Sequence, residues 1–195
     1  MIKLIQELGL KTMNRCDWVL NADKLYQDYH DHEWGVPVYD DDELFAMLIL
    51  EMFHSGLSWY IILKKRENFY KAFDDFDPTK IIEYDEVKIN ELMNDEKIVR
   101  NKAKILATVA NANAFIKLKD ELGSFSDYLW SFVDNEVIFP KDMYLTKNEI
   151  SDHLAHDLKQ RGFKFLGSVT LFAYLQAVGL INSHQPDCFK YNGVK

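Results

Sequence analysis

Glycine, proline and cysteine are scarce in this chain of 195 residues, which contains 8, 4 and 2 of them respectively. Long hydrophobic runs are also missing, since no stretch approaches the roughly 18 uncharged apolar residues that a membrane-spanning helix needs. The opening segment carries Glu7 where a signal peptide would have an unbroken apolar run. We therefore expect a cytoplasmic protein without membrane association, in which a disulfide between Cys16 and Cys188 is disfavoured.

An excess of basic charge is absent as well: 23 lysines and arginines stand against 31 aspartates and glutamates, for a net charge of -8. This charge balance excludes nucleic-acid binding by a generally polybasic surface. A local basic face is still compatible with the negative net charge. Hydrophobic residues at 48% and aromatic residues at 14% are sufficient for a core, which excludes global disorder. The length predicts one domain, and nothing in the sequence demands a dimer, so we expect a monomer.

The apolar spacing follows a period near 3.6 through most of the chain, which predicts an all-α fold. Asp41 is a candidate cap for a helix that ends before Gly56. Ser58 then opens the next helix, and Asp77 followed by proline starts a short one. The few glycines and prolines thus punctuate a series of helices.

The pattern from 85 to 114 predicts a helix-hairpin-helix, with a tight connection at 94–97. The glycine-rich turn that is usual in this motif is absent there. Further helices are predicted over 126–132, 151–160 and 168–178, and a loop over 133–148.

Cysteine and histidine occur in pairs near both ends of the chain. Cys16 is followed by His30, and His184 is followed by Cys188. Two thiolates and two imidazoles match a closed tetrahedral zinc site, which would join the terminal segments across a long loop. Four protein ligands would leave no open position for water, so the zinc would be structural. Alternatively, the cysteines are ordinary small apolar residues and the histidines lie at the surface.

One carboxylate falls on the apolar face of the helix predicted after residue 41. Glu51 lies three residues after Leu48 and seven after Leu44, and a buried carboxylate costs several kcal/mol unless a cation or donors meet it. The neighbouring segments contain the aromatic residues Trp18, Tyr29, Trp34 and Trp59. A pocket with flat walls and one acceptor would suit a planar cationic ring with N–H donors. Alternatively, Glu51 pairs with a core arginine or lysine, or bonds to His54.

Basic residues cluster where the predicted helices begin or end. The clusters are Lys64, Lys65 and Arg66; Arg100, Lys102 and Lys104; and Lys159, Arg161 and Lys164. Such groups could contact phosphates while the remaining surface stays acidic. Solvated helix faces produce the same pattern, so both interpretations stay open.

Several longer motifs follow one another in order. They are R-C-x-W at 15–18, Y-H-D-x-E-W-G-x-P at 29–37, G-L-S-W at 56–59, L-K-K-R-E-N at 63–68, R-G-F-K-F-x-G at 161–167, and a final Q-A-x-G-L-x-N-x-H followed by a cysteine. In these motifs the chain resembles the bacterial DNA-3-methyladenine glycosylase I family, within the helix-hairpin-helix DNA glycosylase superfamily. The resemblance implies that superfamily's all-α fold, with the N- and C-terminal segments joined by a structural zinc site.

The resemblance also implies how the chain is organised. It predicts an N-terminal extension over 1–12 and a single glycosylase domain over 13–195. Within that domain, the hairpin lies near 92–104 and the zinc clip is formed by 16–30 and 184–188.

The implied activity is excision of 3-methyladenine from alkylated double-stranded DNA by hydrolysis of the N-glycosidic bond, as in base excision repair. The enzyme would be monofunctional and would release the free base. Methylation at N3 makes the base cationic and a good leaving group, so binding of the extruded ring can do most of the catalytic work.

By similarity, the resemblance assigns a role to each candidate residue. Glu51 is the catalytic, base-recognition carboxylate, and Leu57 lies nearest the gap left by the extruded nucleotide. The base is surrounded by Tyr29, Trp18, Trp59, Trp34 and His54; the hairpin contacts the DNA backbone through Arg100, Lys102 and Lys104; and zinc is bound by Cys16, His30, His184 and Cys188.

One departure from the family pattern leaves alternatives open. Residues 52–55 replace small or amide residues, with His54 where a glutamine is common, and a protonated histidine would oppose a cationic ring. The first alternative is therefore a protein of the same fold that binds alkylation damage without excising it. The second, a zinc hydrolase of small molecules, would require an open coordination position on the metal.

Overall fold

The computed structural model describes residues 14–140, 142 and 144–192, so the predicted N-terminal extension lies outside the described residues. The described chain is helical, without a β-strand, and has one isolated parallel bridge between Ile138 and Ile181. Its α-helices are α2 (Lys24–His32), α3 (Asp41–His54), α4 (Trp59–Ala72), α5 (Pro78–Ile81), α6 (Glu86–Asn94), α7 (Lys102–Leu122), α8 (Phe125–Trp130), α9 (Glu149–Gln160) and α10 (Ser168–Ala177). The prediction of an all-α fold is confirmed.

Helix α3 lies in the middle of the core and carries Glu51. Its N-cap is Asp40, whose carboxylate accepts two backbone N–H groups of the first turn, at 3.0 and 2.9 Å. The predicted cap, Asp41, is instead the first helical residue, and its carboxylate accepts the backbone N–H of Ser126 at 2.8 Å. That prediction was wrong by one residue because two adjacent aspartates are equally suited to capping. Gly56 follows the helix with a φ of 80°, a conformation that glycine adopts without strain.

The predicted helix starts at Ser58 and Asp77 are confirmed, whereas the helix predicted over 126–132 is observed as α8, Phe125–Trp130. Ser58 is the N-cap residue of α4, and the Asp77 carboxylate caps α5 by accepting the backbone N–H of Thr79 at 2.9 Å. Later in the chain, α9 begins two residues before the predicted start, and α10 begins at the predicted residue. The loop predicted over 133–148 contains no α-helix in its described part, although its first residue ends a 3-10 helix, Ser131–Val133.

Helices α6 and α7 form the predicted hairpin, but their connection runs over 95–101 and is longer than the tight one predicted at 94–97. The side chain of Asn101 caps α7 by accepting a backbone N–H of its first turn at 3.2 Å. From α4, Lys65 donates to the carbonyl oxygens of Glu96 and Lys97, both at 2.9 Å. One of the basic residues singled out in the sequence therefore anchors this connection to the rest of the fold.

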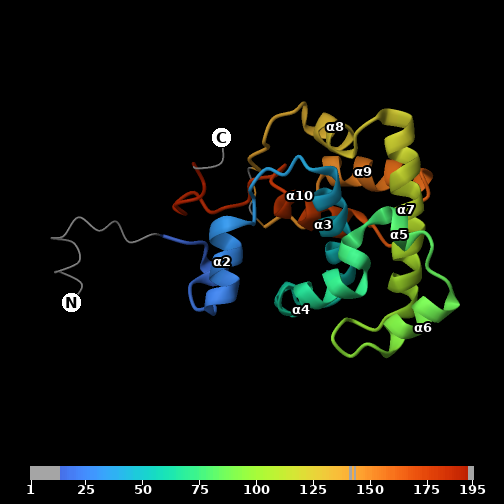
Figure 1. Ribbon diagram of the computed structural model, residues 1–195. Helices are drawn as coiled ribbons and strands as arrows, with labels where there is room; N and C mark the ends of the chain where they lie inside the picture. Colours follow the sequence, from blue (N-terminus) through green and yellow to red (C-terminus); the bar gives the residue numbers. More distant parts are fainter. Residues whose placement is uncertain (1–13, 141, 143, 193–195) are drawn as a thin grey trace.

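Helices α3 and α10 pack against each other at the centre of the molecule (Figure 1). Helices α4, α7 and α8 pack on α3, and α9 packs on α10. Large aromatic side chains fill the space between them, including Phe45, Phe53, Phe69, Phe73, Phe115, Phe125 and Tyr174. Each such side chain contributes about 1.5–3 kcal/mol when fully buried. None of the described helices combines the length and hydrophobicity needed to cross a bilayer.

Helix α2 is absent from the sequence-based prediction. It has nine residues, most of them polar, and Asp23 caps it by accepting the backbone N–H of Tyr26 at 3.1 Å. Without a long apolar stripe, its periodicity is too weak to predict. In Figure 1 it lies beside the red C-terminal segment, so residues from both ends of the described chain meet there.

Candidate metal centre and aromatic pocket

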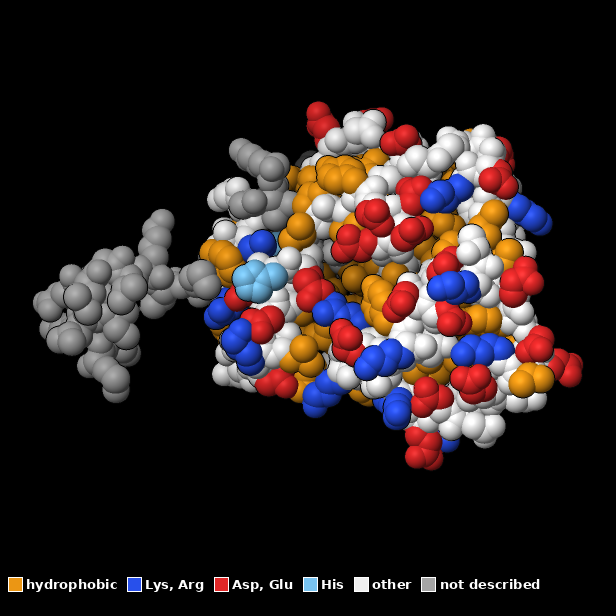
Figure 2. Space-filling model, in the orientation of Figure 1, with side chains coloured by type: hydrophobic (Ala, Val, Ile, Leu, Met, Phe, Trp, Pro, Cys, Tyr) orange, Lys and Arg blue, Asp and Glu red, His pale blue; other side chains and the backbone are white. Residues whose placement is uncertain are grey.

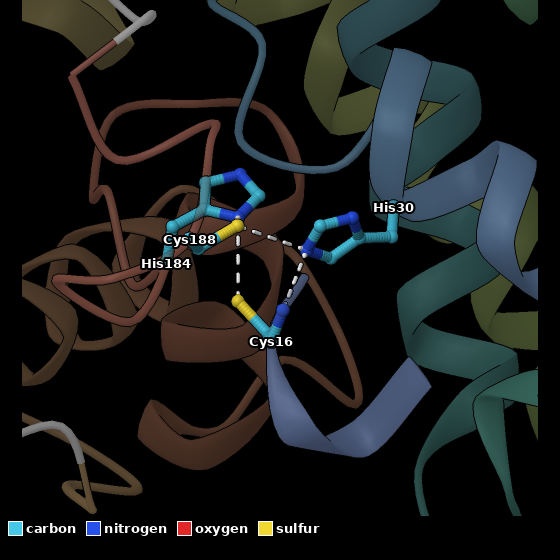
Figure 3. Close-up of side chains that lie close together, drawn as sticks. All are labelled: Cys16, His30, His184 and Cys188. Atoms are coloured by element: carbon cyan, nitrogen blue, oxygen red, sulfur yellow. Dashed lines mark hydrogen bonds between the residues drawn. The ribbon is translucent and has the colours of Figure 1, made fainter. Parts of the chain in front are cut away.

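Four metal-ligating side chains from the two ends of the described chain converge in a buried cluster (Figure 3). These are Cys16, His30, His184 and Cys188, and their ligand atoms all lie within 4.8 Å of one another. The Cys16 Sγ is 3.5 Å from the His184 Nδ1, and the Cys188 Sγ is 3.5 Å from the His30 Nε2. Tetrahedral binding at zinc–ligand bond lengths separates sulfur and nitrogen by about 3.6 Å. The cluster therefore has the dimensions of a tetrahedral metal site.

The outward-facing nitrogens of both histidines have acceptors. The His30 Nδ1 donates to Asp31 Oδ1 at 2.9 Å, and Arg15 pairs with the same carboxylate at 2.7 Å. The His184 Nε2 donates to the carbonyl oxygen of Trp34 at 3.1 Å. These bonds fix the tautomer of each ring, so that each directs a lone pair toward the centre of the cluster.

The electrostatics of the cluster also suit a cation. Burial lowers the pKa of His184 to about 4 and lowers the pKa of His30, so both imidazoles are neutral near pH 7. Burial raises the pKa of the Cys16 thiol to about 12, so its thiolate needs a cation beside it. Neutral imidazoles and thiols that lose their protons to the metal are the donors of structural metal sites. The four residues fit the predicted clip.

Hydrogen bonds beside the cluster join the same two segments. The Asn14 side-chain amide donates to Asp187 at 2.8 Å, and the backbone N–H of Phe189 donates to the Asn14 carbonyl at 2.8 Å. The backbone N–H of Asp17 donates to the Gln185 side chain at 2.8 Å. The two ends are thus held together by backbone and side-chain bonds in addition to the four candidate ligands.

An aromatic cavity of about 180 Å³ lies beside the cluster. It is lined by Trp18, Tyr26, Tyr29, Trp34, Glu51, His54, Trp59, Ala173 and Gln176. The ring centroids of Tyr29 and Trp59 are 5.4 Å apart at 41°, and those of Trp18 and Trp34 are 5.1 Å apart at 84°. The predicted pocket residues are therefore brought together, around a space that suits a small planar ring.

Glu51 is the acidic group of this cavity, with an exposed fraction of 3%. The His54 Nδ1 donates to Glu51 Oε2 at 2.9 Å, whereas Oε1 has no hydrogen-bond partner among the described residues. Burial raises the pKa of Glu51, and the His54 bond opposes part of that shift. The sequence analysis treated a Glu51–His54 bond and an aromatic pocket at Glu51 as alternatives. The structure contains both. Within the described chain, no arginine or lysine pairs with this carboxylate.

Two walls of the cavity rest directly on the metal cluster. The rings of His184 and Trp34 are 4.6 Å apart, and those of His30 and Trp18 are 5.3 Å apart. Between Trp34 and the cluster, Gly35 has a φ of 75°, and a Cβ there would lie 2.9 Å from the His184 Nε2. The cluster therefore braces the aromatic side chains as well as the chain ends.

Sequence reasoning missed Tyr26, which lines the cavity from α2. Its ring stacks with that of Tyr29 at 6.4 Å. The available signal was the three-residue spacing to Tyr29, which places both rings on one helix face. Trp59, a predicted wall residue, has a buried Nε1 without a hydrogen-bond partner among the described residues. An unpaired buried donor of this kind is rare in folded proteins.

The candidate DNA contacts of the hairpin differ in exposure. Arg100 and Lys102 are exposed, whereas Lys104 has an exposed fraction of 7%. The Lys104 ammonium donates to the carbonyl oxygens of Phe53 and Ser55 at 3.0 and 2.6 Å. It therefore holds the C-terminal end of α3, next to Glu51 and His54, and does not face solvent as a phosphate contact would.

The helix periodicity explains why Lys104 differs from its neighbours. Lys104 lies four and seven residues before Thr108 and Asn111, which are both fully buried. All three side chains share the inner face of α7. Burial accordingly lowers the pKa of Lys104. The sequence analysis grouped three basic residues by proximity alone, although one of them belongs to the inner face.

The remaining predicted contact, Leu57, lies in the turn between α3 and α4 with an exposed fraction of 39%. On the face shown in Figure 2, acidic side chains border a hollow with a hydrophobic floor. Lysine and arginine side chains lie among acidic ones over the lower part of the same face and form no continuous basic patch there.

Comparison with known proteins gives a match over most of the chain. Residues 18–191 match the family model described as methyladenine glycosylase. The chain belongs to the methyladenine glycosylase family. It is 41% identical over 187 residues to DNA-3-methyladenine glycosylase 1 of Escherichia coli (strain K12), a match that covers 94% of this chain and 100% of that protein. It is also 41% identical over 178 residues to DNA-3-methyladenine glycosylase of Haemophilus influenzae, covering 89% and 96% of the two chains.

Solved structures of this family have the same fold. A variant of 3-methyladenine DNA glycosylase I in complex with 3-methyladenine superposes with a TM-score of 0.88 at 40% identity, over 94% of this chain and 100% of that one. The 3-methyladenine DNA glycosylase I from Staphylococcus aureus gives a TM-score of 0.87 at 40% identity, over 93% and 98%. The resemblance inferred from the sequence motifs is therefore confirmed at the level of family and fold.

Proposed function

We infer that this chain is a monofunctional DNA glycosylase that excises 3-methyladenine from alkylated DNA by hydrolysing the N-glycosidic bond. Relatives named as DNA-3-methyladenine glycosylases, 41% identical over nearly the whole chain, support this inference. The structural observation that carries it is Glu51, a buried acid in the wall of an aromatic cavity. Such a site matches a planar, electron-poor ring that carries an amino group.

The proposed chemistry relies on binding more than on acid catalysis. Adenine methylated at N3 carries a positive charge on the ring, so it leaves in neutral form with the electrons of the glycosidic bond, while water adds to the anomeric carbon of the sugar and loses a proton. Tyr29 and Trp59 would line one side of the extruded ring, and Glu51 Oε1 would accept a hydrogen bond from its exocyclic amine. These contacts favour the state in which the bond stretches. Unmodified adenine lacks the charge and gains less.

We propose that zinc is the resident metal of the Cys/His cluster. Two thiolates and two imidazoles at tetrahedral distances are the preferred ligands of this ion. When bound, zinc would crosslink the two terminal segments and support the walls formed by Trp18 and Trp34. Because the four protein ligands complete the coordination, a zinc hydrolase with a metal-bound water is disfavoured.

The proposed DNA surface lies on the hairpin and the turn after α3. The exposed side chains of Arg100 and Lys102 would contact phosphates, and Leu57 would fill the gap left by the extruded nucleotide. Lys104 is excluded from this surface because its ammonium is taken up by two carbonyl groups.

Incubation with methylated duplex DNA tests the proposal. Release of free 3-methyladenine, measured by chromatography of the ethanol-soluble fraction, is the expected result. Tight binding to methylated DNA without release would instead indicate a damage-binding protein, the alternative that His54 leaves open. An unmethylated duplex of the same sequence is the control, and it should release no base.

A further inference from the structure

A cavity of about 530 Å³ adjoins the aromatic cavity on the side of the metal cluster, where Cys16 is part of its wall. The two spaces share the side chains of Trp18, Trp34 and Gln176 as walls. The larger space is here called the rear cavity, and its further walls include Asp17, Ser183, Pro186 and Asp187. The functions proposed above make no use of it.

Helix α10 shows how the cavities are ordered. Val169 and Thr170, in its first turn, line a cavity of about 260 Å³ together with Gly56. Ala173 lines that cavity and the aromatic one, and Gln176, in the last turn, lines the aromatic and rear cavities. Because a helix rises about 1.5 Å per residue, roughly 10 Å separate the two ends of this row. The aromatic cavity therefore lies between the turn after α3 and the rear cavity.

The proposed DNA surface lies at one end of this row. It includes Leu57, which directly follows Gly56 in the turn after α3. A duplex bound there would cover the aromatic cavity from that end at the moment when the base is cut. The rear cavity lies at the other end, so it offers the free base an opening that the DNA does not cover.

The charge of the rear cavity excludes DNA but admits a free base. The exposed carboxylates of Asp17 and Asp187 would repel phosphates. One oxygen of Asp17 accepts from the Gln185 side chain at 3.0 Å, and one oxygen of Asp187 accepts from the Asn14 amide at 2.8 Å. The second oxygen of each carboxylate has no hydrogen-bond partner among the described residues. Free 3-methyladenine has no phosphate, and its amino group can donate to such oxygens.

Two of the three shared walls are fixed in place. The Trp34 ring packs on the ring of His184 at 4.6 Å, and the Trp34 carbonyl accepts from the same imidazole at 3.1 Å. The Gln176 side-chain amide donates to Ser183 Oγ at 2.7 Å. Because His184 is a candidate metal ligand, a movement of Trp34 would disturb the metal cluster.

Trp18 is the third shared wall and is less restrained. Its exposed fraction is 40%, and its side chain makes no hydrogen bond within the described part of the chain. Its ring is held by packing against three neighbouring rings, at centroid distances of 4.9, 5.3 and 5.1 Å. Exposed side chains change rotamer within picoseconds to nanoseconds, which is far faster than enzyme turnover. Trp18 is therefore the wall that can open between the two cavities.

We propose that the free base leaves the aromatic cavity through the rear cavity, past the Trp18 side chain, while the DNA remains bound. The proposal rests on the glycosylase function proposed above. It makes the rear cavity a second site for a neutral purine that carries an amino group. The extruded nucleotide then enters, and the free base leaves, at opposite ends of one pocket.

The order of product release tests the proposal in the wild-type protein. A fluorescent duplex with a radiolabelled N3-methyl group is mixed with excess protein, and an unlabelled competitor duplex is then added. Excised base that is still bound stays on a nitrocellulose filter, free base passes through it, and fluorescence anisotropy follows dissociation of the DNA. We expect the base to pass the filter before the DNA dissociates. Release of base and DNA at the same rate would contradict the proposal, because the base would then leave on the DNA side.

Filling the rear cavity tests its role directly. Ser183→Trp and Pro186→Trp each add a large ring at a residue that lines the rear cavity and not the aromatic one. Single-turnover excision should stay within roughly twofold of wild type, since the residues around the base are unchanged. Release of the free base should slow by roughly tenfold, which corresponds to ~1.4 kcal/mol on its barrier.

Ser183→Ala is the matched control, because it removes the same hydroxyl and its bond to Gln176 without adding bulk. It should release the base at the wild-type rate. Ser183 and Pro186 lie within two residues of a candidate ligand, so metal content and helicity are measured for every variant.

Wild-type release by both tryptophan variants, at normal metal content, would contradict the proposal. An equal loss of single-turnover excision would contradict it too, because the rear cavity would then be part of the base site. Failure of the wild-type protein to excise any 3-methyladenine would instead refute the glycosylase function itself.

Discussion

The metal cluster and the aromatic cavity lie side by side and share support, yet their bonding differs. In the cluster, all four ligand side chains are buried, and the second nitrogen of each histidine already has an acceptor. In the cavity, Glu51 keeps one oxygen without a hydrogen-bond partner among the described residues. The cluster is complete once a metal binds, whereas the cavity retains bonding capacity for a ligand.

This difference separates a structural site from a binding site without reference to sequence motifs. A closed set of ligands offers no position to a substrate, so its contribution appears in stability and metal content. A largely buried acid with an unpaired oxygen offers an acceptor to a ligand that carries a donor, so its contribution appears in binding and activity. Substitutions in the two regions should therefore change different observables.

Glu51→Gln should give the largest effect on activity. Replacing the carboxylate removes the negative charge and leaves an amide to meet the amine of the cationic base, so single-turnover excision of 3-methyladenine should fall about 10²–10³-fold. Metal content and helicity should remain as in wild type, because Glu51 does not contact the cluster. Excision at the wild-type rate by Glu51→Gln would show that Glu51 does not take part in excision.

Cys188→Ser should have its main effect on stability. Loss of one thiolate weakens the metal site that joins the terminal segments, and about 2–3 kcal/mol of lost stability lowers the Tm of a domain this size by about 5–10 °C. Metal content measured by atomic absorption and Tm measured by circular dichroism are the readouts. Metal content equal to that of wild type would contradict the clip.

Asp31→Asn tests the support of the cluster from outside the ligand set. Asp31 accepts from the His30 Nδ1 at 2.9 Å, and replacing such an orienting carboxylate typically lowers metal affinity 10–100-fold. Competition with a chelator would measure the change. Asp28→Asn, a partly exposed position on the same helix whose carboxylate pairs with Lys24, is the control and should leave the affinity unchanged.

The burial of Glu51 should also make the free energy of unfolding depend on pH. Burial raises the pKa of Glu51 in the folded state, so the folded protein holds this proton more tightly than the unfolded chain. The stability contributed by Glu51 is therefore fully present below the ordinary carboxyl pKa and is lost as the pH rises through the raised value. Urea unfolding at pH 8 should give Glu51→Gln an equal or higher free energy of unfolding than wild type, with the gap closing toward pH 4. A variant less stable than wild type at pH 8 would contradict this sign.

The smallest expected effects concern the DNA backbone. Arg100→Gln and Lys102→Gln should each weaken binding to undamaged duplex and reduce the slope of log affinity against log salt by about 1. Lys104→Gln should leave that slope unchanged, because its ammonium is bonded to the carbonyls of Phe53 and Ser55. Fluorescence anisotropy at several salt concentrations measures all three. An equal change of slope in Lys104→Gln would indicate that Lys104 contacts DNA phosphates after all.

Much of the fold follows from local sequence signals. Caps such as Ser58 and Asp77, and the stop at Gly56, depend on one or two residues each and are predictable for that reason. Helix α2 was missed because its nine mostly polar residues are held by contacts with the C-terminal segment, which no local pattern encodes. Adjacent aspartates at 40 and 41 left the exact cap of α3 undetermined.

The site was predictable where chemistry restricts the choice of residue. Two cysteines and their histidine neighbours have few other uses in combination, and Glu51 was conspicuous on an apolar face. Lys104 could not be separated from Lys102 by charge, since only the inner face of α7 distinguishes them. A cavity of about 260 Å³ is lined by residues within 51–56 and 169–173. It could not be predicted from the sequence, because it forms only where α3 packs against α10.

A crystal structure with free 3-methyladenine bound tests the central claim most directly. The predicted result is the base in the aromatic cavity, in contact with Tyr29 and Trp59, with its exocyclic amine within hydrogen-bond distance of Glu51 Oε1. A base bound instead in the neighbouring cavity of about 530 Å³ that is lined by Asp17 and Asp187, with the aromatic cavity at Glu51 empty, would contradict the account.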